Sequence, residues 1–442
     1  MVRRVLYDQS NLAYRMGTGI ATYTRNLARA AEGAGFTPEA LLSADVAVDP
    51  RDPLLAEISL FDERRPPALP WLEPVTSAIS GLFRAPFGYR PQRLARAGAV
   101  LRSGQEARDF AETYVTTRLF NAARAQFYAY GRLAAVRLPS PPDLFHATHP
   151  LPVAVRGCPN IVTIHDLVPL RLPYMTLDNK RYIFRLLQTL AARADHIVTV
   201  SEYSRADIIS LLGVPERRVT NTYQAVTLEG RAVALPEAEL HDMIGPLFDL
   251  DPGNYYLFIG ALEPKKNIGK LIDAYAASGS RRPLVIAGGQ GWQNKAELER
   301  INDKRFGFYR ISDNTVSAHR QVRRIPYLPP EQLVMLLRGA RALLFPSVFE
   351  GFGLPVLEAM TLGVPVMTAN RTALPEIAGD AALLVDPSDV TAMARAIRTL
   401  DNDADLLAEL ARRGPARAEL FSMGRYQGRL ASLYQNILGG SG

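Results

Sequence analysis

The chain of 442 residues is long enough for two to three domains, and its 48% hydrophobic and 21% charged residues exclude a disordered or fibrous protein. No apolar run reaches the roughly 18–20 residues of a membrane span, and Asp8 comes too early for a secretory signal. The one cysteine, Cys158, excludes an internal disulfide or a cysteine metal cluster, so we expect a cytoplasmic protein.

The net charge of +7 is concentrated in one part of the chain. Residues 1–200 carry 24 basic and 17 acidic side chains, whereas residues 201–442 carry 27 of each. Within the first part, residues 64–137 hold 12 arginines and only four acids. A regional excess of this kind suits nucleic acid, an anionic membrane surface or an acidic substrate.

Strand-like apolar runs alternate with helical patterns from the N-terminus onward, which predicts a parallel α/β architecture. Residues 3–8 are expected to form the first strand and residues 19–32 the first helix. Further strands of this half are expected at 143–149, 160–166, 196–201 and 219–225. Helices are expected at 177–194 and 201–212, the second with Ser201 as its N-cap.

Residues 60–137 do not fit this alternation. Six prolines between 66 and 91 interrupt the early part, and an Arg- and Ala-rich stretch at about 93–133 has a helical pattern. We predict a helical insertion that carries the charge excess. It is either a solvated subdomain or a surface for an anionic membrane or acceptor, since residues 81–87 combine apolar and cationic groups.

A polar stretch at about 228–251 is typical of a linker, and a second α/β series follows it. Its strands are expected at 255–261, 284–288, 322–328, 342–346 and 364–369. Its helices are expected at 267–277, 295–302, 330–338 and 354–362, with mostly helical chain from 390 to 438. Two α/β domains of similar size follow from this pattern.

The run Phe-Pro-Ser-Val-Phe-Glu-Gly-Phe-Gly-Leu-Pro-Val-Leu-Glu-Ala-Met at 345–360 predicts a strand end, a glycine turn and a helix start. Ligands of open α/β sheets bind at such strand ends. Gly351 and Gly353 allow close approach of the backbone, and the helix N-terminus offers free amides. Glu350 and Glu358 suit the paired hydroxyls of a sugar ring or ribose.

This segment resembles the E-x7-E signature of retaining glycosyltransferases of family four, with Glu350 and Glu358 as the two glutamates. The likeness continues through 363–366, 374–376 and 379–382. It implies the GT-B fold, in which two Rossmann-like domains face each other across a cleft. The implied division is an acceptor-side domain at 1–235, a nucleotide-sugar domain at 236–422, and a last helix at 423–442 that packs back on the first domain.

The resemblance also implies roles for this segment. Glu350, Gly351 and the amides of 352–354 (Phe352, Gly353 and Leu354) would hold the donor sugar, and Glu358 would hold the nucleotide ribose. Glu376 has a plain alternative as an exposed residue at a helix start.

Three of the only six lysines, at 265, 266 and 270, cluster where a strand gives way to a helix. Compact ammonium groups there suit a diphosphate. The family has an E-P-[KR]-K-N segment here, so Lys265 and Lys266 are expected to bind the donor, with Lys266 neutralising its diphosphate. Many relatives add an arginine near the preceding glycine, where this chain has Ala261 and Leu262. Arg205 is a candidate to complete the site.

In the first half, Thr163-Ile164-His165-Asp166 ends a predicted strand. The family has a histidine here that contacts the donor sugar near the reacting carbon, which makes His165 a catalytic candidate with Glu350 and Lys266. Asp166 is expected to fix His165 or the local backbone. His146 and His149 either line the cleft or are structural.

Two further positions follow from the resemblance. Gly19 lies in a segment at 17–23 that is similar to the G-I-x-x-Y segment of the mannosyltransferase-like branch, which borders the donor phosphates and the acceptor. Trp292 follows a glycine-rich turn and lies either near the nucleobase or in the core.

The expected reaction moves mannose from GDP-mannose, with retention of configuration, onto a lipid-linked saccharide in surface polysaccharide or lipopolysaccharide synthesis. Donors carrying rhamnose, glucose or N-acetylglucosamine are alternatives, as is a sugar-nucleotide epimerase of the same fold. No cofactor or metal is expected, because D-x-D matches at 249–251 and within 401–405 lie away from strand ends.

The insertion is expected to contact an anionic membrane surface on the inner face of the cytoplasmic membrane. Nucleic acid is disfavoured because the basic region lacks the regularly interleaved aromatic residues of a stacking platform.

Overall fold

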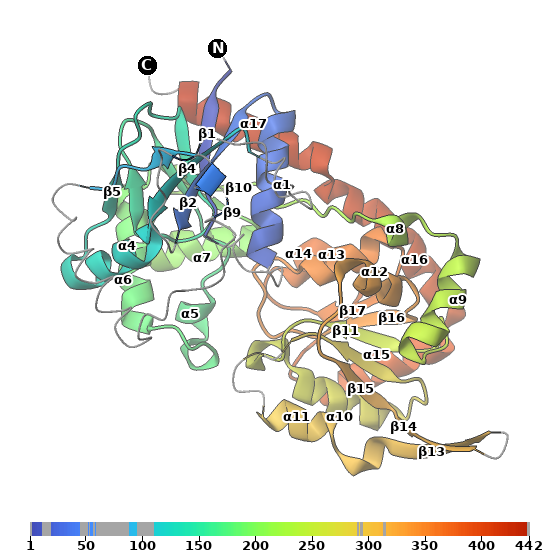
Figure 1. Ribbon diagram of the computed structural model, residues 1–442. Coiled ribbons are helices and arrows are strands. Elements are labelled where there is room, and N and C mark those ends of the chain that lie inside the picture. Colours follow the sequence, from blue (N-terminus) through green and yellow to red (C-terminus); the bar gives the residue numbers. More distant parts are fainter. Residues whose placement is uncertain are drawn as a thin grey trace.

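The computed structural model describes residues 2–10, 19–44, 52, 54–55, 58, 88–94, 110–289, 291, 295–312 and 315–439. These residues form two α/β domains placed side by side, with both chain ends near the first domain (Figure 1). Most of the predicted basic insertion, at 60–87 and 95–109, lies outside the described residues, as do Trp292 and residues 17–18.

The first domain is built on an eight-stranded sheet with the order β10-β9-β8-β6-β1-β2-β4-β3. All neighbours pair in parallel except the short edge strand β3. The strands are β1 (Arg4–Asp8), β2 (Thr37–Ala44), β3 (Gln92–Arg93), β4 (Glu112–Thr117), β6 (Leu144–Ala147), β8 (Asn160–Thr163), β9 (His196–Thr199) and β10 (Val219–Asn221). The strand order reverses between β1 and β6, and this reversal is the topological switch point of the domain.

The second domain has a six-stranded parallel sheet with the order β15-β12-β11-β16-β17-β18, which is the Rossmann order 3-2-1-4-5-6. Its strands are β11 (Tyr256–Ile259), β12 (Leu284–Ala287), β15 (Val322–Ile325), β16 (Ala342–Phe345), β17 (Val366–Ala369) and β18 (Leu383–Val385). Every residue of β11, β12, β16 and β17 is buried, which explains their continuous apolar runs. The switch point here lies between β11 and β16.

Helices cover both sheets. The first domain has α1 (Gly19–Gly33), α4 (Leu119–Tyr130), α5 (Val168–Arg171), α6 (Lys180–Arg193) and α7 (Glu202–Leu212). The second has α9 (Glu237–Phe248), α10 (Ile268–Ser278), α11 (Lys295–Ile301), α12 (Pro330–Arg338), α13 (Leu354–Thr361), α14 (Leu374–Ala378), α15 (Val390–Asn402) and α16 (Ala404–Ala418). In the stretch of chain that connects the two domains, α8 (Arg231–Ala234) packs on α12 of the second domain.

Two short strand pairs complete the described elements. In the first domain, β5 (Ala134–Val136) pairs with β7 (Val153–Val155). In the second, β13 (Gly307–Ser312) and β14 (Thr315–Arg320) form a hairpin that projects from the body of the domain (Figure 1).

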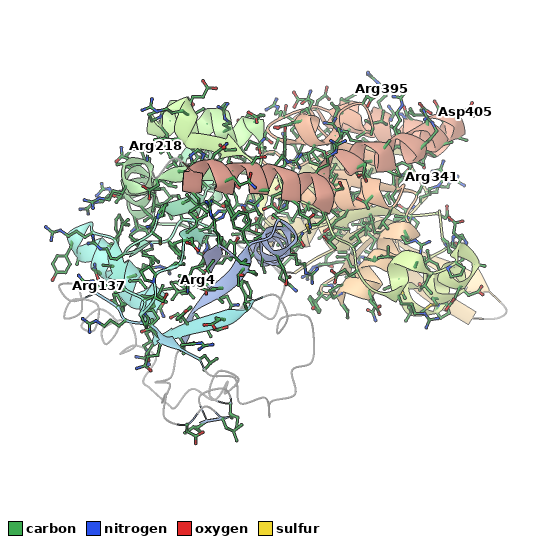
Figure 2. The ribbon with its side chains drawn as sticks, turned by 90° about the horizontal axis from the view of Figure 1, so that it is seen from above. Arg4, Arg137, Arg218, Arg341, Arg395 and Asp405 are labelled. Carbon is green, nitrogen blue, oxygen red and sulfur yellow. The ribbon has the colours of Figure 1, made fainter. Side chains whose placement is uncertain are left out.

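The last helix, α17 (Met423–Gly439), runs from the second domain back across the first and packs against α1 (Figure 2). Tyr426, Leu430, Leu433 and Tyr434 form its buried face. The predicted return of the C-terminal helix to the first domain is therefore confirmed, and one hydrophobic core extends through both domains.

A buried hydrogen-bonded chain attaches α17 to the first sheet. The Tyr434 hydroxyl lies 2.9 Å from the Tyr7 hydroxyl and 2.7 Å from Nδ1 of His146. Nε2 of His146 lies 2.8 Å from the Thr163 hydroxyl, which is 2.9 Å from the hydroxyl of Tyr23. Burial lowers the pKa of His146 to about 3, so the ring is neutral and bridges two hydroxyl groups. His146 is thus structural, one of the two roles that the sequence left open.

One prediction about the insertion is wrong in part. Residues 112–117 were expected within a helical stretch, but they form β4, which pairs in parallel with β2 over six residues. Tyr114 and Val115 are buried in this strand, and α4 begins only at Leu119. Because β4 is a strand of the sheet itself, the first domain resumes before residue 112, earlier than the predicted boundary at 137.

Candidate functional site

A buried ion pair lies at the switch point of the second domain. Glu350 follows β16, and Lys266 ends the short 3-10 helix η4 (Pro264–Lys266), which follows β11. Nζ of Lys266 donates to Oε1 of Glu350 at 2.7 Å, and the Ser347 hydroxyl donates to the same oxygen at 2.6 Å. The Glu350 amide donates to the hydroxyl of Thr372 at 3.1 Å. Two donors therefore hold Oε1 of the carboxylate, and Thr372 fixes the backbone of the same residue.

The charges of this cluster stabilise one another. Burial alone would raise the pKa of Glu350, but Lys266, Lys265 and the Ser347 hydroxyl outweigh it, so the pKa is lowered. Burial likewise opposes the charge of Lys265, yet Glu350, Asp166 and Glu263 raise its pKa. Lys265 thus stays charged where the sequence predicted a diphosphate site.

The glycine turn after Glu350 brings the two domains into close contact. A Cβ atom at position 351 would lie 2.6 Å from the carbonyl oxygen of His165 in the first domain, so only glycine fits. Gly353 has φ 110°, and a Cβ atom there would lie 2.7 Å from Leu374. The predicted donor residues of the second domain therefore face the predicted histidine of the first.

Gly19, Leu354 and Phe352 lie at the same junction. A Cβ atom at Gly19, the first residue of α1, would be 3.6 Å from Cδ1 of Leu354, the first residue of α13. The Phe352 ring is buried and packs edge-on against Phe421, with ring centroids 5.8 Å apart. The first turn of α13 is thus fixed between the two domains.

Glu358 lies on α13, one turn into the helix, and is half-buried. Burial raises its pKa to about 7, and among the described residues no hydrogen bond or ion pair reaches its carboxyl group. Both of its oxygens are therefore available for hydroxyl groups of a ligand.

His165 is held rigidly at the carboxyl end of the first sheet. Its Nε2 lies 2.9 Å from the carbonyl oxygen of Thr148, and Tyr23 packs edge-on with ring centroids 4.7 Å apart. Burial lowers its pKa, so the ring is neutral. Because a carbonyl oxygen only accepts, Nε2 carries the proton and Nδ1 keeps its lone pair. Asp166 accepts the Val168 amide at 3.1 Å and so fixes the local backbone.

Glu376 joins the two domains directly and is not a plain exposed residue. From α14 in the second domain, its carboxylate oxygens accept the amides of Glu202 at 2.7 Å and Tyr203 at 3.2 Å. These amides are orphan donors in the first turn of α7 in the first domain. Nearby, Tyr203 packs edge-on against Phe349, the residue before Glu350, with ring centroids 5.7 Å apart. Glu376 therefore works as an interdomain helix cap.

Arg205 is not joined to the lysine cluster. Its guanidinium donates to the Val219 carbonyl oxygen at 3.0 Å and to Glu216 at 2.8 Å, both in the first domain. Among the described residues, no hydrogen bond or ion pair links it to the second domain. Arg205 thus lies apart from the junction where the loop at 350–354 meets His165 and Gly19.

Sequence reasoning assigned no role to Ser347, Tyr23 or Thr148. Ser347 and Tyr23 lie inside the segments that resemble the family, so the sequence could have indicated both. Thr148 has no such signal, because it acts through its backbone carbonyl.

Residues of both D-x-D matches make contacts within the second domain, and Oδ2 of Asp249 lies 3.5 Å from Nη1 of Arg323. Asp401 accepts from the Tyr256 hydroxyl at 2.7 Å and from Arg282 at 2.6 Å, and Asp403 caps α16. Across the residues that the structure describes, no group of three or more His, Cys, Asp or Glu side chains is arranged to hold a metal ion.

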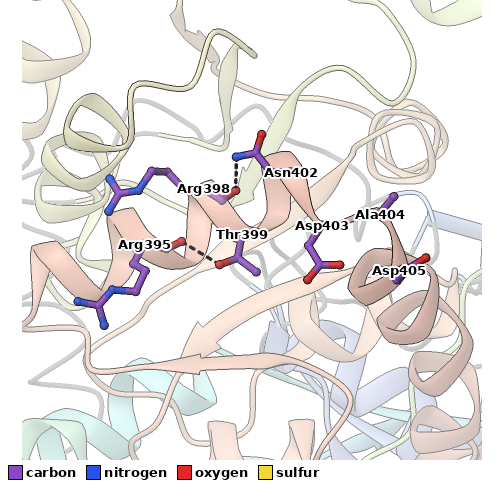
Figure 3. A pocket seen from close by; sticks show the side chains of 7 residues that line it. All are labelled: Arg395, Arg398, Thr399, Asn402, Asp403, Ala404 and Asp405. Atoms are coloured by element: carbon purple, nitrogen blue, oxygen red, sulfur yellow. Dashed lines mark hydrogen bonds between the residues drawn. The ribbon is translucent and has the colours of Figure 1, made fainter.

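An open pocket on α15 and α16 is separate from the interdomain site (Figure 3). The Thr399 hydroxyl donates to the Arg395 carbonyl oxygen and Asn402 to that of Arg398, while the Arg398 guanidinium donates to the Ala277 carbonyl oxygen on α10. The pocket therefore contributes no group to the cluster around Glu350.

Two family models match the chain. Residues 249–417 match "Glycosyl transferases group 1", and residues 88–229 match "Glycosyltransferase Family 4". The first match contains Lys266, Glu350 and Glu358, and the second contains His165. The chain belongs to glycosyltransferase family 4.

Several curated relatives are named as mannosyltransferases. O-antigen chain mannosyltransferase B of Escherichia coli is 35% identical over 274 residues, which cover 59% of this chain and 66% of that protein. The serotype-specific mannosyltransferase WbdA of Escherichia coli is 31% identical over 275 residues, 59% of this chain and 31% of that protein. The chain thus spans about two thirds or less of the length of these relatives.

Solved structures share the architecture at low identity. Sucrose-phosphate synthase from Thermosynechococcus elongatus has a TM-score of 0.64 at 17% identity, covering 99% of this chain and 100% of that one. HepE from Anabaena, in complex with UDP and glucose, has a TM-score of 0.64 at 14% identity, covering 98% and 100%. The predicted GT-B fold of two Rossmann-like domains is confirmed.

The Lys266–Glu350 pair generates a stability prediction. In Lys266→Met, the buried Glu350 loses its main partner, and breaking a buried pair costs about 3–5 kcal/mol. In the wild type, the pKa of Glu350 is lower in the folded protein than in the unfolded chain. Its charged form therefore stabilises the fold at pH values above the unfolded pKa, and this contribution is lost as the pH falls through the folded pKa. In the variant, burial disfavours the charged form. The difference in Tm between the two proteins should therefore be largest near pH 8 and shrink towards pH 5.

Lys270→Met is the matched control, because Lys270 is exposed and its Nζ lies 3.4 Å from the Ser388 carbonyl oxygen. Its Tm should follow the wild type at every pH. An equal loss of Tm at pH 5 and pH 8 in Lys266→Met would contradict the assigned ion pair.

The Glu376 cap generates a second prediction. Glu376→Ala removes the carboxylate that caps the start of α7. Losing such a cap costs about 1–2 kcal/mol, so the two domains should separate more readily. Small-angle scattering should show a larger radius of gyration than for the wild type. Asp380→Ala is the control, since Asp380 is exposed and its carboxylate lies 3.5 Å from Arg413 of its own domain. Identical scattering of Glu376→Ala and the wild type would exclude the cap as an interdomain link.

Proposed function

We propose that this protein is a retaining glycosyltransferase that moves mannose from GDP-mannose to a lipid-linked saccharide during synthesis of a surface polysaccharide. One observation carries the proposal. The loop that follows the Lys266–Glu350 ion pair lies against the backbone of His165, at the carboxyl end of the first sheet. The choice of mannose is supported by the mannosyltransferase relatives.

Donor cleavage builds negative charge on the diphosphate and positive charge on the sugar ring. Lys266, Lys265 and the amides at the start of α13 are the groups proposed to stabilise the diphosphate, and Lys266 is held in place by Glu350. Glu350 is proposed to accept hydroxyl groups of the donor sugar with its second oxygen, Oε2, and Glu358 those of the ribose. Arg205 has no role in this proposal.

We favour substitution on one face of the sugar. The bond from the anomeric carbon to the diphosphate oxygen breaks as the bond to the acceptor oxygen forms, and the departing phosphate takes the acceptor proton. Neutral His165 is proposed to contact the sugar near the reacting carbon, because a protonated ring would oppose the developing positive charge. The lysines and helix amides supply the charge neutralisation, so no metal or other cofactor is proposed.

The transfer reaction tests the proposal directly. The full chain, GDP-mannose and undecaprenyl-linked oligosaccharides should give an acceptor lengthened by one hexose, detected by mass spectrometry. Glu350→Ala and Lys266→Ala should each lower kcat roughly 10²–10³-fold, since each removes a group from the charged centre. The control Lys270→Ala should retain full activity.

A panel of other sugar nucleotides identifies the donor. Transfer from dTDP-rhamnose or a UDP-sugar alone would contradict the mannose assignment. An epimerised sugar released without an acceptor would contradict transfer itself, and full activity of Glu350→Ala would contradict the site.

We also propose that the first domain contacts the anionic inner face of the cytoplasmic membrane. No helix in the described parts of the chain is both long and apolar enough to cross a membrane. Arg90 and Arg93 of the basic region are exposed. Neutralising Arg84, Arg90, Arg93 and Arg96 together should weaken binding to vesicles containing phosphatidylglycerol, by about 1 kcal/mol for each charge that lies near the surface.

Co-sedimentation at low and high salt measures this binding, with phosphatidylcholine vesicles as the neutral reference. A matched control neutralises four exposed arginines of the second domain and should bind as the wild type does. These are Arg281, Arg395, Arg398 and Arg412. No binding of the wild type at low salt, or equal loss in both quadruple variants, would overturn the membrane proposal.

A further inference from the structure

Exposed aromatic side chains gather on one part of the first domain. Of the aromatic side chains whose surroundings the structure describes, the exposed ones are Tyr128, Tyr130, Tyr174, Phe184 and Tyr327. The first four lie within residues 128–184 of the first domain, and only the last belongs to the second domain. Large apolar groups that gather on a protein surface mark a contact with a partner, so this part of the first domain is a candidate interaction surface.

The end of α4 lies beside the first half of α6, on the outer side of the first domain (Figure 1). The rings of Phe127 and Tyr182 pack edge-on between the two helices, with centroids 5.5 Å apart. A Cβ atom at Gly131, the residue that ends α4, would lie 2.6 Å from Nη2 of Arg185 on α6. These contacts place the last turn of α4, which carries two of the exposed tyrosines, next to the helix that carries Phe184.

The same two helices carry positive charge without a compensating acid. Residues 118–137 and 180–193 hold eight basic residues and no acidic residue, whereas the whole chain has a net charge of only +7. Three exposed arginines accompany the three exposed rings of these helices. The α4–α6 face is defined by these six side chains: Tyr128, Tyr130, Phe184, Arg132, Arg181 and Arg185.

The chemistry of the α4–α6 face fits an anionic lipid surface. Tyrosine rings favour the headgroup level of a bilayer, where the apolar ring and the polar hydroxyl are both accommodated. Arginine side chains bury their stems along apolar surface and keep the guanidinium near lipid phosphates. A second copy of the same face is a poor occupant, because a two-fold contact would bring like charges together.

Exposed apolar groups continue from α6 toward the transfer site. The 3-10 helix η2 (Pro173–Met175) and the loop that leads into α6 expose Tyr174 and Leu177, each by 69%. Burial lowers the pKa of Lys265, but the charges of nearby acids outweigh it, and Asp178, the residue after Leu177, is one of them. The loop therefore lies between α6 and the lysine cluster of the second domain.

We propose that the α4–α6 face docks on an anionic lipid bilayer and holds the transfer site beside the membrane. This inference rests on the membrane contact of the first domain proposed above, and it assigns the apolar part of that contact to α4 and α6. The exposed rings enter the headgroup layer, and the arginines lie among the lipid phosphates. Tyr174 and Leu177 extend the same contact toward the site.

Vesicle binding of the full chain tests the charged part of the face. A triple variant replaces its three arginines with glutamine. It should bind phosphatidylglycerol vesicles roughly 100-fold more weakly than the wild type at low salt, because each charge near an anionic surface contributes about a factor of five. The matched control removes three exposed arginines of the second domain and should bind as the wild type does: Arg281→Gln, Arg395→Gln and Arg412→Gln.

Tryptophan fluorescence tests the aromatic part with a change that keeps a ring in place. Tyr128→Trp should be quenched by vesicles that contain dibrominated phosphatidylglycerol, because the indole enters the headgroup layer. Tyr327→Trp is the matched control, since Tyr327 is 54% exposed in the second domain, and its added fluorescence should not change. The wild type, with its two tryptophans, supplies the background signal.

Three results would overturn the inference. They are equal binding of the wild type and the triple variant of the α4–α6 face, no quenching of Tyr128→Trp, and a lipid-free dimer that the triple variant dissociates. If the wild type binds no anionic vesicle, the membrane contact proposed above falls as well. Transfer to a water-soluble oligosaccharide judges the transferase function separately, and in the triple variant this reaction should keep the wild-type rate.

Discussion

The close approach of Gly351 to the carbonyl oxygen of His165 is the contact on which the rest of the site depends. It leaves no space for a Cβ atom, so the loop after β16 and the loop after β8 lie backbone to backbone. Two further contacts lie at the same interface. Glu376 accepts a hydrogen bond from an amide of α7, and the Tyr203 ring packs against Phe349. The charged cluster around Glu350 belongs to the second domain, and His165 belongs to the first.

The two domains repeat one topology and use it for different chemistry. In each, the strand order reverses at a crevice on the carboxyl edge, and polar residues follow the two strands that flank it. The second domain places two ammonium groups and a glutamate there, which suits a charged ligand. The first places histidines and one buried carboxylate there. The two domains therefore present different groups at their switch points.

Much of this arrangement could be predicted from short segments of sequence. Strand–turn–helix patterns located the elements that carry Lys266, Glu350 and His165, because each pattern is local. The strand at 112–117 was missed because its neighbourhood is rich in Arg and Ala, and only pairing with β2 decides its conformation. The Glu376 cap could not be predicted either, since it joins residues 174 positions apart and depends on how the domains pack.

The position of α17 has a consequence for how the chain acquires its structure. Tyr434 bonds to Tyr7 across 427 positions, and α17 follows the entire second domain in the chain. During synthesis, the first sheet leaves the ribosome long before the helix that covers Tyr7 and His146 exists. Until then these groups meet water in place of α17, and an apolar surface stays open to chaperones or to other nascent chains. The order of translation therefore makes the first domain the last to be completed.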